Sequence, residues 1–249
     1  MKDYTKINQK MFDKWVEEGW QWGIPITKEV YDKAKQGIYE IYLTPTKKVP
    51  NDWLKDIKGK HVLGLASGGG QQIPILQALG AKVTCLDISE KQLETEKKLS
   101  KEFGYDIHLV QADMTNPLPF QDETFDLIFY PVSNVYIEKV EPVFLECYRI
   151  LKKGGVLLSG LDNGFNFAFD DEDGKILFDL PFNPLNDIEQ YEYMVKHDYG
   201  IQFSHTMEEQ IGGQLKAGFR LVDIYEDTNL SGYLKENNIP SFYATKSIK

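Results

Sequence analysis

The order of hydrophobic and polar positions along the chain predicts alternating strands and helices. Short apolar runs of strand length occur near 61–65, 81–86, 107–110, 125–130 and 156–159. The segments between them carry apolar residues at the spacing typical of amphipathic helices. Strands that alternate with helices in this way predict an α/β fold, in which helices cover both faces of a mainly parallel sheet.

The first apolar run, which begins at His61, ends in a glycine-rich turn, Ala66-Ser67-Gly68-Gly69-Gly70, and a helical pattern follows from about Gln71 to Leu79. Glycine allows a ligand to approach the backbone and adopts positive φ at little cost. We therefore expect exposed amides at this helix start to donate hydrogen bonds to a ligand. The second run ends in Asp87, where nucleotide-binding folds place a carboxylate for a ribose.

A second helix is expected over 89–103, with Ser89 as its N-cap and Gly104 after its end. Its charged residues are interpreted as one solvated face, made of Glu90, Lys91, Glu94, Glu96, Lys97, Lys98, Lys101 and Glu102.

Further along the chain, helices are expected over about 137–151 and 204–217, and strands over 219–226 and 241–247. Residues 160–203 lose periodicity and are acidic and aromatic, which predicts an insertion that acts as a lid over the acceptor site or else forms a surface flap. Residues 1–58 are expected to form an N-terminal helical cap segment, before a main domain over 59–249. The aromatic residues of this segment either pack onto the core or roof a cofactor pocket.

The succession of strand, glycine turn, helix, strand and Asp87 resembles the class I S-adenosylmethionine-dependent methyltransferases, whose turn reads G-x-G-x-G. The stretch Arg149-Ile150-Leu151-Lys152-Lys153-Gly154-Gly155 is also similar to the family's pattern before the fifth strand. Two positions depart from the family. Ala66 replaces the usual first glycine, and Gly64 replaces an acidic residue that usually helps to orient the turn. The resemblance covers 59–160 closely and 204–249 in outline.

The resemblance implies a doubly wound, mostly parallel seven-stranded sheet, with the N-terminal helical segment and the lid insertion added to it. It implies S-adenosylmethionine as cofactor, with Asp87 on the ribose, Asp113 on the adenine amino group and Met114 against the adenine ring. The expected cofactor-binding residues are Ala66, Ser67, Gly68, Gly70, Asp87, Ile88, Gln92, Asp113 and Met114.

The strand end at 131–136 should face the transferred methyl group, because ligands of open parallel sheets lie beyond the carboxyl ends of the strands. Asn134 and Tyr136 are therefore candidates for the substrate side. No catalytic residue is assigned, although His197 and His205 fall in or beside the insertion and are candidates for a base. No spacing of residues supports a metal site.

The net charge limits the kinds of binding partner, and the cysteines indicate the cellular compartment. The formal net charge of −10 opposes a polyanionic partner, so nucleic acid is not expected and a small-molecule methyl acceptor is favoured. Cys85 and Cys147 lack the spacing of a metal or redox motif, which is typical of buried thiols in a reducing cytoplasm. Neither a signal peptide nor a membrane span is expected.

Three functions agree with these features. The first is methyl transfer from S-adenosylmethionine to a small molecule. The alternative is a protein that binds S-adenosylmethionine or S-adenosylhomocysteine without catalysis, which the glycine at position 64 leaves open. A nicotinamide-dependent oxidoreductase is disfavoured, because Gln71 occupies the place of the last glycine in G-x-G-x-x-G.

Overall fold

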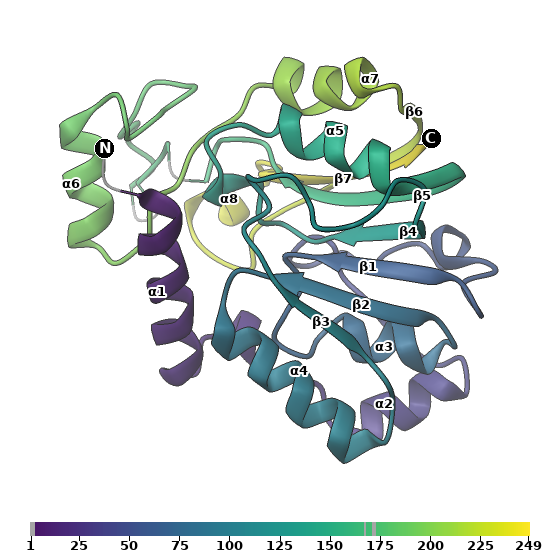
Figure 1. Cartoon of the computed structure of the whole chain (residues 1–249). Coiled ribbons are helices and arrows are strands. Elements are labelled where there is room, and N and C mark those ends of the chain that lie inside the picture. The colour runs from purple at the N-terminus through teal and green to yellow at the C-terminus, as the bar shows by residue number, and fades with distance from the viewer. Residues whose placement is uncertain (1–2, 167, 171–172) are drawn as a thin grey trace.

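The computed structural model describes residues 3–166, 168–170 and 173–249. Within these residues the strands form a seven-stranded sheet in the order β3-β2-β1-β4-β5-β7-β6 (Figure 1). Neighbouring strands are parallel from β3 to β5, whereas β7 runs antiparallel to both β5 and β6. The strands are β1 His61–Leu65, β2 Lys82–Asp87, β3 His108–Gln111, β4 Phe125–Tyr130, β5 Leu151–Asp162, β6 Arg220–Asp227 and β7 Phe242–Ile248.

Helices cover both faces of the sheet, which confirms the doubly wound fold. On one face lie α2 (Lys28–Lys35), α3 (Ile73–Ala78) and α4 (Glu90–Phe103), and on the other lie α5 (Glu141–Ile150) and α7 (Gly213–Ala217) (Figure 1). Helices α1 (Tyr4–Glu17) and α6 (Ile188–Lys196) lie side by side beyond one end of the sheet, and α8 (Tyr233–Glu236) precedes β7. The central strands coincide with the apolar runs of the sequence, because a strand of a parallel sheet is buried on both faces.

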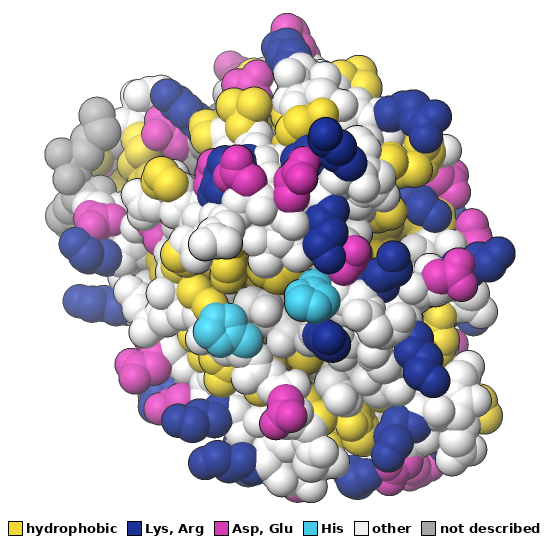
Figure 2. All heavy atoms as spheres, turned by 45° about the vertical axis from the view of Figure 1, so that its right-hand side comes forward, with side chains coloured by type: hydrophobic (Ala, Val, Ile, Leu, Met, Phe, Trp, Pro, Cys, Tyr) yellow, Lys and Arg dark blue, Asp and Glu magenta, His cyan; other side chains and the backbone are white. Residues whose placement is uncertain are grey.

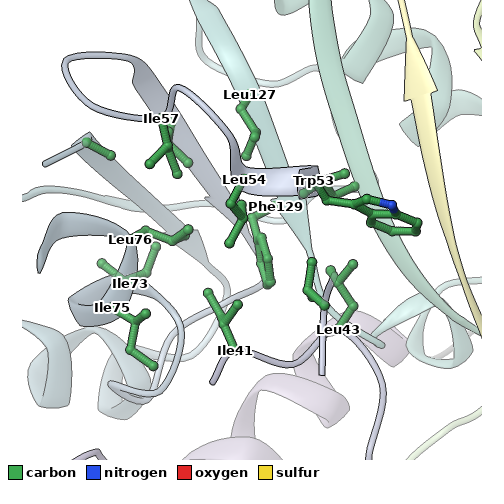
Figure 3. Packing of buried hydrophobic residues seen from close by; sticks show 14 of the residues in the cluster. Ile41, Leu43, Trp53, Leu54, Ile57, Ile73, Ile75, Leu76, Leu127 and Phe129 are labelled. Carbon is green, nitrogen blue, oxygen red and sulfur yellow. The ribbon is translucent and has the colours of Figure 1, made fainter. Parts of the chain in front are cut away.

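The N-terminal segment contributes to the main core. Ile41, Leu43, Trp53, Leu54 and Ile57 are buried in one cluster with residues of α3 and β4 (Figure 3). The indole Nε1 of Trp53 also donates a hydrogen bond of 2.8 Å to Asp223 of β6. This half of the segment is therefore built into the core beside α3 and β4, whereas α1 packs against α4. The division at residue 58 stays a prediction.

Three boundaries differ from the sequence expectation. The helix expected at 137 begins at Glu141, because Asn134–Tyr136 first form a short 3-10 turn. The strand expected near 156–159 is longer, since β5 starts at Leu151 and includes the Lys-Lys-Gly-Gly stretch. The helix expected over 204–217 is a π-helical turn, Glu208–Gly212, followed by α7. Of the two added segments, residues 1, 2, 167, 171 and 172 lie outside the described residues.

Candidate active site

A cavity lies at the carboxyl ends of four parallel strands. Ala66 follows β1, Asp87 ends β2, Asp113 follows β3 and Ser133 follows β4, and all four line the cavity. The N-terminal segment covers the opposite side with Thr5, Asn8, Phe12 and Trp20. This is the sheet edge at which open parallel folds bind their ligands.

The cavity brings together most of the expected cofactor residues. Those on its wall are Ala66, Asp87, Ile88, Gln92, Asp113 and Met114. The cavity is not bordered by the other three expected residues, Ser67, Gly68 and Gly70. Of the turn, only Ala66 reaches the cavity wall. Ala66 itself has a φ of +48°, a conformation that favours glycine, and its N–H donates to Leu86 O at 2.8 Å. The alanine therefore occupies the glycine position of the motif with the backbone shape of a glycine.

The amides of the three glycines in the turn donate hydrogen bonds within the protein, and the expectation that amides of the helix start donate to a ligand stays a prediction. Gly68 N–H donates to Asp87 Oδ2 at 2.9 Å, Gly69 N–H to Gln92 O at 3.2 Å, and Gly70 N–H to Glu96 Oε1 at 2.7 Å. Three acceptors from β2 and α4 thus hold the turn. The glycines are needed for this approach, since a Cβ on Gly68 would lie 2.6 Å from the Cβ of Gln92.

Asp87 is the charged group that joins the turn to the cavity. Its side chain is 8% exposed, and besides the Gly68 contact its Oδ1 accepts Ser89 N–H at 2.9 Å. Burial raises the pKa of Asp87 to about 6, although the backbone donors at Ser89 and Gly68 oppose this shift. Each carboxylate oxygen keeps a second lone pair for a ligand in the cavity.

Glu96 was expected on the solvated face of its helix, and this was wrong. The side chain is fully buried and its Oε2 has no hydrogen-bond partner. Gln92, Glu96, Leu99 and Phe103 are spaced as one helical stripe, and all four are buried. That spacing was the available signal. At Gly64 a Cβ would lie 2.3 Å from Cδ1 of Ile73, so the family's acidic side chain would require the Ile73 side chain to move.

Asp113 and Met114 form the wall after β3. The Oδ1 of Asp113 accepts hydrogen bonds from Thr115, at 2.9 Å from the backbone N–H and 2.7 Å from the hydroxyl. These contacts fix the carboxylate and leave Oδ2 without a bond to Thr115. The Met114 side chain is 9% exposed and presents apolar atoms beside it.

Aromatic rings form the wall opposite the sheet. Phe12 meets Tyr136 edge to face at a centroid distance of 4.8 Å, and Trp15 lies 4.9 Å from Trp20. Phe12, Trp20 and Tyr136 line the cavity. Phe12 and Trp20 of the N-terminal segment therefore roof it, while other aromatic residues of the same segment pack on the core. Apolar residues on an amphipathic helix do not reveal which of these two surfaces they will cover.

The two substrate-side candidates have different positions. Tyr136 lines the cavity, whereas Asn134 is fully buried behind it. The Asn134 amide donates to Asp162 O at 3.1 Å and to Gln210 Oε1 at 3.0 Å, and its Oδ1 accepts Asp162 N–H. Asn134 therefore fastens β5 to the strand end after β4 and does not face a ligand. The sequence could not show this, because its partners come from distant elements.

The two histidine candidates also lie away from the cavity. His205 is buried, with Nε2 3.0 Å from Asn134 O, and burial lowers its pKa. His197 is exposed and pairs through Nδ1 with Tyr193 O at 2.7 Å. Within the described part of the chain, no lysine, arginine or histidine lines the cavity. Its only carboxylates are Asp87 and Asp113.

The same described ranges hold no group of three His, Cys, Asp or Glu side chains arranged to hold a metal ion. They also contain no helix long and apolar enough to cross a bilayer. Figure 2 shows one face of the molecule, on which basic and acidic side chains are interspersed over the whole surface. That face therefore carries no broad basic patch of the kind that binds a polyanion.

The insertion approaches the cavity through α1 and through the segment after β4, where Phe203 N–H donates to Val135 O at 2.7 Å. No described residue of 160–203 lines the cavity, so the roof is α1 rather than the insertion itself. The buried Asn8 links the two, since its amide donates to Ile201 O at 2.9 Å and its Oδ1 accepts Ile201 N–H at 2.8 Å. At the other side of α1, Asp13 Oδ1 accepts Ser89 Oγ–H at 2.7 Å.

We expect Asn8→Ala to loosen α1 and the insertion together. The variant loses two buried hydrogen bonds, each of which contributes about 0.5–1.5 kcal/mol. Amide hydrogen exchange should become faster in 4–17 and in 188–203. The matched control is Lys14→Ala, which removes the half-exposed ion pair to Asp198 between the same elements and should change little. Faster exchange in α1 alone would contradict the link.

The fold and the cavity together define a nucleotide-cofactor enzyme of the class I methyltransferase type. Residues 63–159 match the methyltransferase domain family. Over 249 aligned residues the chain is 41% identical to YbaJ of Bacillus subtilis (strain 168), described as an uncharacterized methyltransferase, with 97% of each chain covered. The chain therefore belongs to the S-adenosylmethionine-dependent methyltransferases, and S-adenosylmethionine is its cofactor.

Solved structures agree with this fold. An S-adenosylmethionine-dependent methyltransferase from Mesorhizobium loti is similar with a TM-score of 0.64 and 19% identity, over 80% of this chain and 95% of that one. Geranyl diphosphate C-methyltransferase from Streptomyces coelicolor A3(2), solved with S-adenosyl-L-homocysteine, has a TM-score of 0.57 and 15% identity, over 80% and 76% of the two chains. At these identities the likeness concerns the fold.

Proposed function

We propose that this methyltransferase transfers the methyl group to a small acceptor that carries no negative charge. The observation that carries the proposal is the cavity wall, which presents aromatic rings and two carboxylates but no basic side chain among the described residues. A phosphate or carboxylate acceptor would meet no positively charged side chain on this wall. A cationic or neutral acceptor suits the rings of Phe12, Trp20 and Tyr136.

We place the cofactor along the strand ends. Asp87 accepts hydrogen bonds from the ribose hydroxyls beside Ile88 and Gln92, Asp113 Oδ2 accepts one from the adenine amino group, and Met114 packs on the ring. The free lone pairs of Asp87 and the open Oδ2 of Asp113 support this placement. The methyl group then points towards Tyr136 and the aromatic wall.

The catalytic contribution of this site is orientation. Methyl transfer is an in-line displacement whose electrophile belongs to the cofactor, so alignment with a lone pair of the acceptor can supply several kcal/mol. The roof made by α1 covers the cavity on the side opposite the sheet and shields it from water there. A small acceptor with a free lone pair fits this covered site.

Binding and turnover test the proposal separately. Calorimetry should show binding of S-adenosylhomocysteine and none of NAD. A labelled methyl donor should then methylate members of a panel of small amines, thiols and phenols, while matched analogues that bear a carboxylate or phosphate react at least about tenfold more slowly, as expected for an uncompensated charge. Methylation of the anionic analogues alone, or of RNA or protein, would overturn the acceptor class.

A further inference from the structure

The buried carboxyl group of Glu96 has no place in the function described so far. It lies on α4, is fully buried, and reaches the glycine turn rather than the cavity. Its Oε1 accepts Gly70 N–H at 2.7 Å, while Oε2 is buried without a partner. Among the residues that the structure describes, no lysine or arginine pairs with it.

Such a group costs folding free energy that a leucine at the same place would avoid. The titratable groups facing it are Asp87 and Cys85 from β2 and Tyr105 after α4. Burial raises the pKa values of Cys85 and Tyr105, so both remain neutral, and Asp87 adds a negative charge. A carboxyl kept in these surroundings needs a reason beyond packing.

Two of the three acceptors that hold the turn are carboxyl groups. Asp87 fixes it at Gly68, and Glu96 fixes it at Gly70. Gly70 has a φ of +80°, and its carbonyl oxygen accepts Ile26 N–H at 2.9 Å, so the same residue also anchors the N-terminal segment. Release of Gly70 would therefore move both Ala66 and Asp87 on the cavity wall and the segment that covers it.

We propose that Glu96 is a positioning residue for the cofactor: its carboxyl group holds the Gly70 end of the glycine turn and thereby sets Ala66 and Asp87 in their binding positions. This role rests on the cofactor site proposed above. Glu96 acts through the turn, since it does not touch the cavity.

The contact has a direct signature in the protein without ligand. Burial, with Asp87 nearby, raises the pKa of Glu96 from 4.5 to about 8. The Gly70 amide proton should therefore shift in NMR spectra of the wild-type protein as Glu96 ionises around this pH, because a carboxylate is a stronger acceptor than the neutral acid. The shift should be absent in Glu96→Gln. A Gly70 amide that shows the same pH dependence in the wild type and in Glu96→Gln would overturn the contact.

Stability gives a second readout with a defined sign. Between its unfolded value of 4.5 and its folded value of about 8, Glu96 binds more protons in the folded protein, so stability decreases as the pH rises through this range. Glu96→Gln cannot ionise. Its melting temperature should therefore gain on that of the wild type by on the order of 5 °C between pH 5 and 8.5. Asp87 raises the pKa of Glu96, so the difference between the two proteins includes the repulsion between these two carboxylates.

The affinity for S-adenosylhomocysteine distinguishes a positioning role of Glu96 from a role in core packing alone. Glu96→Leu should weaken S-adenosylhomocysteine binding about tenfold, because Gly70 N–H loses its buried acceptor. Glu96→Gln should bind within about twofold of wild type, since its amide oxygen accepts the same bond. The controls are Glu102→Leu and Glu102→Gln on the exposed face of α4.

The outcomes distinguish this role from the site itself. If Asp87→Ala weakens binding and Glu96→Leu does not, the role of Glu96 is wrong while the site stands. If neither variant changes the affinity, the proposed site falls and the role of Glu96 falls with it. Should Glu96→Leu not fold, the Gly70 titration and the glutamine variant still decide the matter.

Discussion

Asp87→Ala is expected to weaken the binding of S-adenosylhomocysteine by tenfold or more. A carboxylate that accepts hydrogen bonds from ribose hydroxyls contributes about 1.5–3 kcal/mol per bond at most, and the variant also removes the acceptor of Gly68 N–H. Calorimetry on the folded variant measures the effect. An affinity equal to that of wild type would reject Asp87 as the ribose ligand.

The matched control for this prediction is Asp126→Ala at the opposite end of the sheet. Asp126 also accepts a backbone hydrogen bond, from His61 N–H at 2.9 Å, and pairs with Lys152, but it lies at the start of β4. Its loss should lower stability and leave the cofactor affinity unchanged. The pair of variants therefore separates ligand binding from the general cost of removing a strand-end carboxylate.

The same carboxylate makes binding depend on pH. In the protein without ligand the pKa of Asp87 is about 6. Hydrogen bonds from the ribose favour the ionised form, so the ligand lowers this pKa and binds more weakly when the group is protonated. The affinity should accordingly decrease as the pH falls from 7 to 5, and Asp87→Asn should remove this dependence.

Gly70→Ala is expected to destabilise the fold severely and to abolish cofactor binding. The residue has a φ of +80°, and a Cβ would lie 2.3 Å from Leu99 Cδ1 and 2.8 Å from the Cβ of Pro25. The conformational cost alone is of order 1–3 kcal/mol, and the overlap adds to it because the proline ring cannot swing away. Thermal unfolding and calorimetry measure the two effects.

Gly104→Ala isolates the conformational part of that cost. Gly104 ends α4 with a φ of +75°, and a Cβ there would meet no atom within 4 Å. This variant should show only the smaller loss of stability and should bind S-adenosylhomocysteine as the wild type does. Equal behaviour of the two alanine variants would mean that crowding at the turn has no part in the effect.

The sequence by itself determined the class of fold and much of the cofactor wall. Strand-length apolar runs, amphipathic helices and the Ser89 and Gly104 caps are local patterns, and local backbone preferences decide them. The position of three residues on the cavity wall could be predicted: Asp87, Asp113 and Met114. Each lies at or just after the end of a strand, and the carboxyl ends of parallel strands share one edge of the sheet. The role of each on the cofactor stays a prediction.

Contacts between distant segments decided the rest. A charged stripe on α4 does not say which way the helix turns, so Glu96 was assigned to solvent until packing placed it under the glycine turn. Asn134 was assigned to the substrate, yet its partners in β5 and the π-helical turn draw it into the interior. The sequence left open whether the N-terminal segment or the insertion covers the cavity. In the structure, the hydrogen bonds of Asn8 and Asp13 hold α1 over it. Each outcome depends on which surfaces meet after folding. For Glu96 alone the spacing of the buried residues on α4 gave a signal in advance.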